Sequence, residues 1–211
     1  MKAVVLSGGT PPPIDLLRRE LSDSDYLICA DSGADFLYKE NVLPDFLMGD
    51  FDSVSKEAFE FFKISSTKIE KFPKDKDFTD TKLAFMKALE LGISHISFLG
   101  CTGTRLDHSI GNIGVLLDCI ENGITGYIID NNNKIFLSRE TVKIHGAKGD
   151  TFSLFAFDET VDNLSISGSK FNLNNYKLTI GDGLTISNEF KEEEVIITFT
   201  SGTLLVIESK D

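Results

Sequence analysis

The stretch YLICADSGADFLYKENVLPDFLMGD, residues 26–50, decides the fold class of this 211-residue chain. It opens and closes with the short apolar runs YLICAD and DFLMGD, which are typical of strands buried on both faces. Similar runs occur at residues 3–8, 95–100 and 126–130. Helical patterns separate several of these runs. We therefore expect βαβ units and an N-terminal, mainly parallel sheet with flanking helices.

Two of these helices are predicted with defined ends. The first covers residues 79–92, with Thr79 as its cap and Gly92 as its end. Its expected apolar positions are Leu83, Met86 and Leu89 or Glu90. The second runs from about residue 106 to 121 and is stopped by Gly123. Its predicted apolar stripe consists of Ile110, Ile113, Leu117 and Ile120.

After Asn133 the pattern changes to short alternating runs separated by Gly, Asn and Asp, without any helical period. This pattern indicates an all-β segment, an antiparallel sandwich or a small barrel. The segment NNNK at residues 131–134 marks the boundary. We therefore expect an α/β domain over residues 1–130, followed by a β-sandwich domain over residues 131–211.

The composition excludes several classes of protein. With a net charge of −12 and a pI near 4.7, the surface repels nucleic acid and anionic membranes. A nucleotide substrate is still compatible, because a bound divalent cation reverses the local charge. No apolar run approaches 18 residues and no signal-peptide pattern is present, so we expect a soluble cytoplasmic protein. The three cysteines form no CxxC pair and are interpreted as small buried hydrophobes.

The segment GDFDS follows the third predicted strand and places two aspartates close together. Gly49 permits a tight turn, and Asp50 and Asp52 come directly after it. In extended backbone, residues i and i+2 point to the same side, so the two carboxylates can share a hard cation such as Mg²⁺. The alternative is an Asx turn or a helix cap, with Ser53 or Ser55 opening the next helix.

A second acidic cluster, KDKDFTDTK, precedes the helix at residues 79–92. Asp77 and Asp80 would complete the metal site, while a lysine such as Lys82 would offset phosphate charge. Lys74 and Lys76 are interleaved with these acids. The alternative is a solvated loop with a helix cap, provided by Thr79 or Asp77. Because both acidic clusters lie at strand ends of the same sheet, each supports the other.

Glycine-containing loops follow the other strands. SGG at residues 7–9 and ADSGAD at residues 30–35 would let backbone N–H groups approach a phosphate, although neither is a Walker A loop and each fits a simple turn. GCTGTRLDHSIGN at residues 100–112 is the third loop. It brings Arg105, Asp107, His108 and Asn112 into a helix, where His108 and Asn112 share a face. The alternative for His108 is a structural, hydrogen-bonded histidine.

Four motifs together resemble the thiamine pyrophosphokinase family of bacterial type. They are ADSGADFLYKENVLPDFLMGDFDSV, KDFTDTKLAF, GTRLDHSIGN and TISNEF, and their order and spacing match over nearly the whole chain. The resemblance implies a nucleotide-binding α/β domain, a thiamine-binding β sandwich, and a homodimer with the active site between the subunits. The implied reaction transfers the pyrophosphoryl group of ATP to the hydroxyl of thiamine, giving thiamine diphosphate and AMP.

The resemblance also implies roles for individual residues. Mg²⁺ would be held by Asp50, Asp52, Asp77 and Asp80. The nucleotide would lie against Asp31, Gly33, Lys82, Arg105, His108 and Asn112. Thiamine would contact Ser187, Asn188 and Glu189, with Ser187 at the aminopyrimidine. Catalysis would depend on Asp52, Asp80, Arg105 and Asp107, with Asp80 or Asp107 accepting the proton of the thiamine hydroxyl.

The chain departs from the family pattern at two positions. Ser32 stands at the first glycine of the family's ADGGA loop, and Thr104 replaces a glycine in GGRxDH. The chain has no tryptophan, so any aromatic ring that stacks on thiamine must be Phe, Tyr or His.

Two other classes of protein compete with this interpretation. A phosphatase with a DxD nucleophile would fit DFDS, but such a motif normally follows the first strand and leaves GTRLDH without a role. A non-catalytic thiamine or nucleotide sensor would need no set of four acids.

Overall fold

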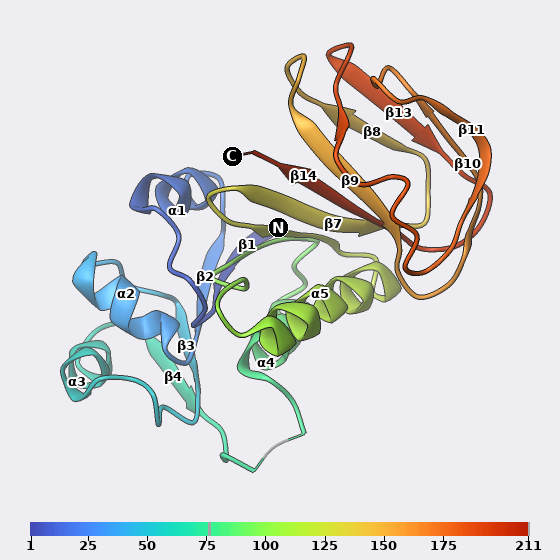
Figure 1. Ribbon diagram of the computed structural model, residues 1–211. Coiled ribbons are helices and arrows are strands. Elements are labelled where there is room, and N and C mark those ends of the chain that lie inside the picture. The colour runs from blue at the N-terminus through green and yellow to red at the C-terminus, as the bar shows by residue number, and fades with distance from the viewer. Residues whose placement is uncertain (76, 211) are drawn as a thin grey trace. The chain divides into compact units, whose positions relative to one another are not determined.

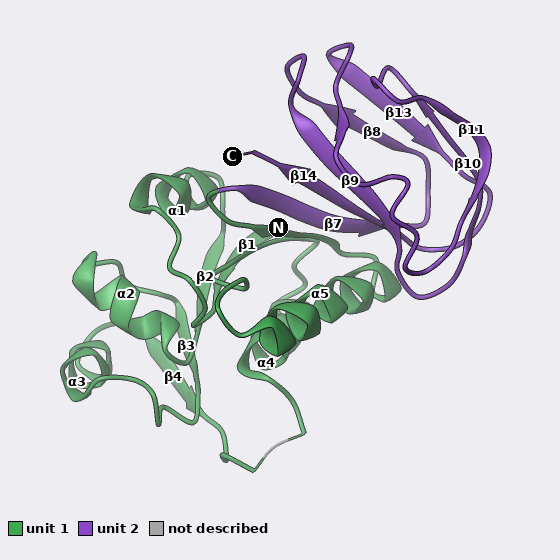
Figure 2. Cartoon of the chain, in the orientation of Figure 1, with its two compact units in different colours: residues 1–131 green, residues 132–211 purple. Residues whose placement is uncertain are grey.

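The computed structural model describes residues 1–75 and 77–210. The chain forms two compact units, Met1–Asn131 and Asn132–Asp211, coloured separately in Figure 2. Across the described ranges, no helix is long and apolar enough to cross a membrane.

Unit 1 contains a six-stranded sheet in which every pair of neighbouring strands is parallel. Its strand order is β6-β5-β1-β2-β3-β4. The order therefore reverses between β1 and β5, which is where open α/β sheets bind ligands. The strands are β1 Lys2–Leu6, β2 Tyr26–Ala30, β3 Phe46–Gly49, β4 Lys68–Lys71, β5 His95–Leu99 and β6 Thr125–Ile129.

Helices cover both faces of this sheet (Figure 1). They are α1 Ile14–Leu21, α2 Gly33–Lys39, α3 Lys56–Lys63, α4 Asp80–Glu90 and α5 Leu106–Glu121. Alternate strand residues such as Val4, Leu27 and Leu47 share one core with α1, α2 and α3. The opposite face packs against α4 and α5. The doubly covered sheet explains the continuous apolar runs of its strands.

The two predicted helices are present, but their buried faces differ from the prediction. Thr79 caps α4 by accepting a hydrogen bond from the N–H of Lys82 at 3.3 Å. Met86 and Leu89 were expected to be buried, yet they are 43% and 41% exposed. Because small side chains let α4 approach the sheet closely, the buried face is instead made by Thr81, Leu83, Ala84, Phe85 and Ala88.

The second helix, α5, has the predicted bounds, but its buried face also differs from the predicted stripe. Ile110 is 59% exposed. Ile113, Leu117 and Ile120 are half-buried, and the fully buried face consists of Asn112, Val115, Leu116 and Cys119.

Unit 2 is made of two antiparallel sheets, which confirms the predicted fold class. One sheet has the order β12-β9-β14-β7 and the other β11-β10-β13-β8. One apolar core contains residues from both sheets, among them Phe152, Leu164 and Val206. The strands are β7 Asn133–Ser138, β8 Val142–His145, β9 Thr151–Ala156, β10 Val161–Ser167, β11 Leu173–Leu178, β12 Asn188–Glu189, β13 Glu194–Thr198 and β14 Leu204–Ser209.

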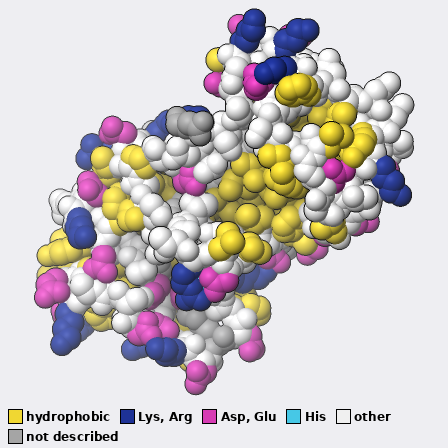
Figure 3. All heavy atoms as spheres, in the orientation of Figure 1, with side chains coloured by type: hydrophobic (Ala, Val, Ile, Leu, Met, Phe, Trp, Pro, Cys, Tyr) yellow, Lys and Arg dark blue, Asp and Glu magenta, His cyan; other side chains and the backbone are white. Residues whose placement is uncertain are grey.

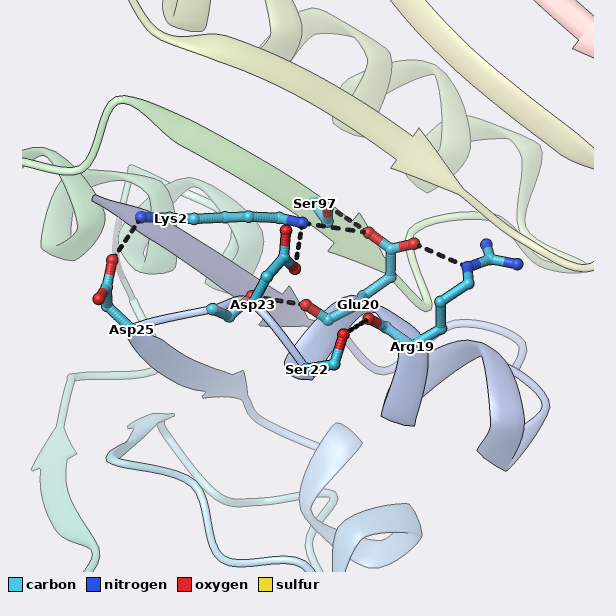
Figure 4. Close-up of polar contacts among 8 residues, drawn as sticks. Lys2, Arg19, Glu20, Ser22, Asp23, Asp25 and Ser97 are labelled. Atoms are coloured by element: carbon cyan, nitrogen blue, oxygen red, sulfur yellow. Dashed lines mark hydrogen bonds and ion pairs between the residues drawn. The ribbon is translucent and has the colours of Figure 1, made fainter.

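A polar network ties the end of α1 to the first residue of β1 and to the middle of β5 (Figure 4). The hydroxyl of Ser97 donates to Oε2 of Glu20 at 2.8 Å, and the Glu20 side chain is only 12% exposed. Nζ of Lys2 donates to Oδ1 of Asp23 at 2.7 Å, while its backbone N–H donates to Asp25 at 2.8 Å. The hydrogen bond from Ser97 to Glu20 gives the buried hydroxyl and the mostly buried carboxylate their partners, whereas the contacts of Lys2 are exposed.

Candidate active site

A pocket of about 470 Å³ lies in unit 1 beyond the carboxyl ends of β1, β2 and β5. Residues 7–10 after β1 and residues 100–105 after β5 lie side by side in its lining, at the point where the strand order reverses. The N–H groups of Gly9 and Thr10 donate to the carbonyls of Gly100 and Thr102, both at 2.7 Å. Four glycines in these two loops expose backbone to the pocket. The remaining lining comes from residues 30–32 after β2, Ser53, and the starts of α4 and α5. Such a glycine-lined recess suits a phosphate-bearing ligand.

Three carboxylates gather beside this pocket, and of these Asp31 lines it whereas Asp50 and Asp52 do not. Asp31, Asp50 and Asp52 each offer an oxygen within 4.8 Å of the others. The hydroxyl of Ser53 donates to Oδ2 of Asp31. Oδ1 of Asp31 is buried and has no hydrogen-bond partner among the described residues. Burial is the main cause that raises the pKa of Asp31, and the charges of Asp80 and Asp50 raise it further.

The backbone between Asp50 and Asp52 is a turn, not the extended segment that the sequence suggested. The N–H of Asp52 donates to Oδ1 of Asp50 at 2.9 Å, and Phe51 has φ +64°. The ring of Phe51 packs on that of Phe59, with centroids 5.2 Å apart. Phe51 thus anchors the turn on the core, and the two acids still come together. The Asx turn and the acid group, first treated as alternatives, occur together.

Gly49 is what brings this turn against Asp31. Its φ is +149°, and a Cβ built there would lie 3.1 Å from the Cβ of Asp31. A larger residue would push the end of β3 away from Asp31.

The cap of the next helix is Ser55, whose hydroxyl accepts from the N–H of Ala58 at 3.3 Å. The two aspartates are therefore not used as helix caps.

In the second acidic cluster, residues 74–82, Asp80 lies at the pocket and Asp77 does not. Asp80, the first residue of α4, lines the pocket. Asp77 is exposed on the preceding loop and is not a member of the group of three. Nζ of Lys74 pairs with Asp52. Lys76 lies outside the described residues.

Lys82, predicted to neutralise phosphate charge, does not line the pocket. Its Nζ pairs with Oδ2 of Asp118 at 2.5 Å and lies 5.2 Å from the ring centroid of Phe85. The first turn of α4 therefore presents Asp80 to the pocket and directs Lys82 toward α5. A role for Lys82 at the phosphates stays a prediction that this arrangement does not support.

Only some of the predicted residues between Arg105 and Asn112 line the pocket. Arg105 and His108 line the pocket, whereas Asp107 does not. The guanidinium of Arg105 donates to Asp107 at 2.6 Å, which holds the pKa of that carboxyl below its usual value. Asn112 is buried and donates to the carbonyl of Cys101 at 2.8 Å. Asn112 therefore ties α5 to the loop after β5, besides lining the pocket.

Gly33 and Asn188, both predicted to bind a ligand, are buried and serve the local structure. Gly33 is buried at the start of α2 and does not line the pocket. In unit 2, Asn188 is buried, and its side chain bonds to Ser169 and to the backbone of Phe171 and Glu189. Its amide group is thus used to hold the local backbone.

The other two residues expected at thiamine are more accessible than Asn188. Oε1 of Glu189 accepts from Nζ of Lys170 at 2.6 Å. Ser187 is exposed at φ +56°, and its N–H donates to Oγ of Ser153 at 3.0 Å. The Ser187 hydroxyl makes no hydrogen bond within the described chain, so of the three it is the group best placed to meet a ligand.

Several hydroxyl groups of the pocket were missed by the sequence reasoning. Ser7 and Thr81 share a buried hydrogen bond of 2.9 Å, and Ser53 contacts Asp31. The membership of Asp31 in the acid group was also missed. The signal was present, because Asp31 directly follows a strand adjacent to the one that precedes Asp50, and parallel neighbours end at the same edge.

A glycine-lined pocket at a strand-order reversal, bordered by grouped carboxylates, is typical of enzymes that act on phosphate groups. The family model "Thiamin pyrophosphokinase, catalytic domain" matches residues 17–128, and "Thiamin pyrophosphokinase, vitamin B1 binding domain" matches residues 134–204. The chain therefore belongs to the thiamin pyrophosphokinase family and is a transferase of this kind.

Individual relatives agree with this assignment. The thiamine pyrophosphokinase of Bacillus subtilis (strain 168) is 30% identical, and the match covers 100% of both chains. Thiamine pyrophosphokinase 2 of Arabidopsis thaliana is 27% identical over 87% of this chain and 78% of its own. The crystal structure of the Bacillus subtilis enzyme superimposes with a TM-score of 0.89 at 28% identity, covering 100% of both chains.

Proposed function

We propose that this chain transfers the pyrophosphoryl group of ATP to the hydroxyl of thiamine, giving thiamine diphosphate and AMP. The observation that carries the proposal is the pocket itself. Its glycine-containing loops can receive phosphates, and Oδ1 of Asp31, which has no hydrogen-bond partner among the described residues, lies at its side among grouped carboxylates. Membership of the family supplies the two substrates.

The acid group fits a magnesium ion. Hard divalent cations prefer carboxylate oxygens, and Asp31, Asp50 and Asp52 bring three of these within 4.8 Å. The buried Oδ1 of Asp31 has no hydrogen-bond partner in the described part of the chain, which is costly and suits a cation ligand. Mg²⁺ bound there would neutralise negative charge on the phosphates of ATP. Asp80 borders the same group, whereas a direct role for Asp77 stays a prediction.

The chemistry requires one bond to form and one to break. The hydroxyl oxygen of thiamine bonds to the β-phosphorus of ATP, and the bond from that phosphorus to the bridging oxygen of AMP breaks. The hydroxyl proton passes to a carboxylate. Asp80 is the better acceptor, because it lines the pocket. Asp107 lies outside the lining, and its pairing with Arg105 lowers its pKa.

Arg105 and His108 would also act on the phosphates. Both line the pocket at the start of α5. The guanidinium is permanently charged, and its exposed pairing with Asp107 is the kind that a phosphate can replace at little cost. Its charge would then offset the negative charge that develops on AMP as it leaves.

Unit 2 would bind thiamine in a homodimer. Ser187 supplies a hydroxyl that is free among the described residues. Unit 2 also exposes the large apolar residues Phe171, Ile180, Leu184 and Ile186. Figure 3 shows apolar side chains gathered on the part of the surface that unit 2 forms. Their burial against a second copy would be favourable, which supports the proposed dimer.

Calorimetry with thiamine, with and without ATP and Mg²⁺, followed by detection of AMP, tests the proposed function. We expect AMP to form only when all three are present, and Asp52→Asn or Asp80→Asn to abolish it in a folded protein. Near-normal turnover in both variants would contradict the assignment of the acids. Phosphate release from simple phosphomonoesters without thiamine would favour a phosphatase, and thiamine binding without turnover would favour a sensor.

A further inference from the structure

Ser32 is a pocket residue whose hydroxyl makes no hydrogen bond to the described residues. It directly follows Asp31 and occupies the position before α2, yet its side chain makes no capping hydrogen bond. Among the residues that the structure describes, the hydroxyl has no hydrogen-bond partner. Ser32 lines the pocket together with Asp31 and Asp80. A polar group that is half-buried, unused and beside a ligand pocket is available to a ligand.

Gly8 determines where this hydroxyl lies. A Cβ built on Gly8 would be 1.8 Å from Oγ of Ser32 and 3.1 Å from its Cβ. The Ser32 side chain therefore occupies the space that any other residue at position 8 would fill. Oγ is held over the loop after β1, and Gly8 itself lines the pocket.

The surroundings indicate which ligand atom the hydroxyl would meet. Consecutive Cα atoms are about 3.8 Å apart, so Ser32 adjoins the acid group that contains Asp31. A cation held by that group would bring phosphate oxygens to this side of the pocket. Phosphate oxygens are strong hydrogen-bond acceptors, and a serine hydroxyl is a donor that adds no charge.

We propose that Ser32 is a phosphate-binding residue, whose hydroxyl donates a hydrogen bond to a β- or γ-phosphate oxygen of the nucleotide, and that Gly8 is required to keep it there. The proposal rests on the proposed ATP site. It adds a specific donor at a position where the motif resemblance would have a glycine, which has no side chain to donate.

The test is isothermal titration calorimetry of the full chain with Mg²⁺ and two ligands, α,β-methylene-ATP and AMP, in the absence of thiamine. Ser32→Ala is expected to bind the ATP analogue about 10-fold more weakly, as for a lost hydrogen bond to a charged acceptor. Its affinity for AMP should stay within about twofold, because AMP lacks the β- and γ-phosphates. Equal losses for both ligands, or no loss for either, would overturn the proposal.

A double-mutant cycle tests the part played by Gly8. Gly8→Ala should weaken binding of the analogue when Ser32 is present, because the methyl group displaces the hydroxyl. Added to Ser32→Gly, the same change should have little further effect, since the space is then empty. An equal effect of Gly8→Ala in both backgrounds would show that Gly8 does not act through Ser32.

The outcome for the wild-type chain separates the two proposals. If the wild type does not bind the ATP analogue, the nucleotide site is wrong and the role of Ser32 is wrong with it. If the wild type binds the analogue and turns over thiamine, while Ser32→Ala binds equally well, only the role of Ser32 is wrong. Circular dichroism melting curves of each variant confirm that the protein measured is folded.

Discussion

The backbone N–H of Asp52 donates a hydrogen bond of 2.9 Å to Oδ1 of Asp50. One carboxylate therefore both shapes the turn and belongs to the acid group with Asp31. These two roles can be separated, because an asparagine side-chain oxygen accepts the same hydrogen bond but carries no charge.

We expect Asp50→Asn to keep the turn and lose the cation, whereas Asp50→Ala should lose both. The melting temperature without divalent cation should fall for Asp50→Ala and not for Asp50→Asn. Titration of Mn²⁺ in the presence of ATP, followed by electron paramagnetic resonance, should show weakened binding for both. Unchanged Mn²⁺ affinity in Asp50→Asn would remove Asp50 from the site.

Without a bound cation, the grouped carboxylates of Asp31, Asp50 and Asp52 should lower the stability of the fold. Asp31 has a buried oxygen without a described partner, and the charges of Asp80 and Asp50 disfavour its ionised form. Asp31→Asn should therefore raise the melting temperature in EDTA by about 2–4 °C, which corresponds to about 1 kcal/mol for a chain of this size. The same variant should lose AMP formation.

Asp77→Asn is the matched control for this prediction, because Asp77 is exposed and lies outside the group of three. Its melting temperature should not change. A lower melting temperature for Asp31→Asn would mean that the ionised carboxylate stabilises the fold, which is the opposite of the expected effect.

Stability should depend on the network in Figure 4 through Glu20. Glu20→Ala leaves the buried hydroxyl of Ser97 without its acceptor and should lower the free energy of unfolding by about 1–3 kcal/mol, measured by urea denaturation. Asp23→Ala is the control, because Asp23 is 67% exposed and should change this quantity by no more than about 0.5 kcal/mol. Equal effects would show that the buried hydrogen bond is not what stabilises this corner.

The cysteines should be unreactive although Cys101 lines the pocket. Burial raises the pKa of the Cys101 thiol to about 12, and it also raises that of Cys119 to about 12 and that of Cys29. At pH 8 the thiolate of Cys101 is then on the order of one part in ten thousand. Iodoacetamide should label the native chain very slowly and all three thiols quickly in urea, as read by mass spectrometry. Rapid labelling of native Cys101 would contradict this burial.

The sequence predicted the fold well because its signals are local. Continuous apolar runs mark strands buried on both faces, and Thr79 identifies a helix start through its own hydrogen bond. The buried side of each helix was predicted less well. The alanines of α4 lie toward the sheet while Met86 faces solvent, and that choice depends on how closely the helix can approach the strands.

The candidate site was predicted only in part for a similar reason. Asp50, Asp52 and Asp80 were recognised from motifs, and all three lie at or beside the pocket. The side chain of Lys82 pairs with Asp118 because α4 packs on α5, and this packing cannot be predicted from the residues around Lys82 in the sequence. Likewise, Asn188 is engaged by a neighbouring loop that is distant in sequence.

The bond that is broken in ATP can be identified by ³¹P NMR of the products formed from ATP, thiamine and Mg²⁺. A single transfer of the pyrophosphoryl group predicts AMP and thiamine diphosphate in equal amounts, without ADP. Accumulation of ADP together with thiamine monophosphate would contradict the proposed reaction, because the bond broken would then lie between the β- and γ-phosphates.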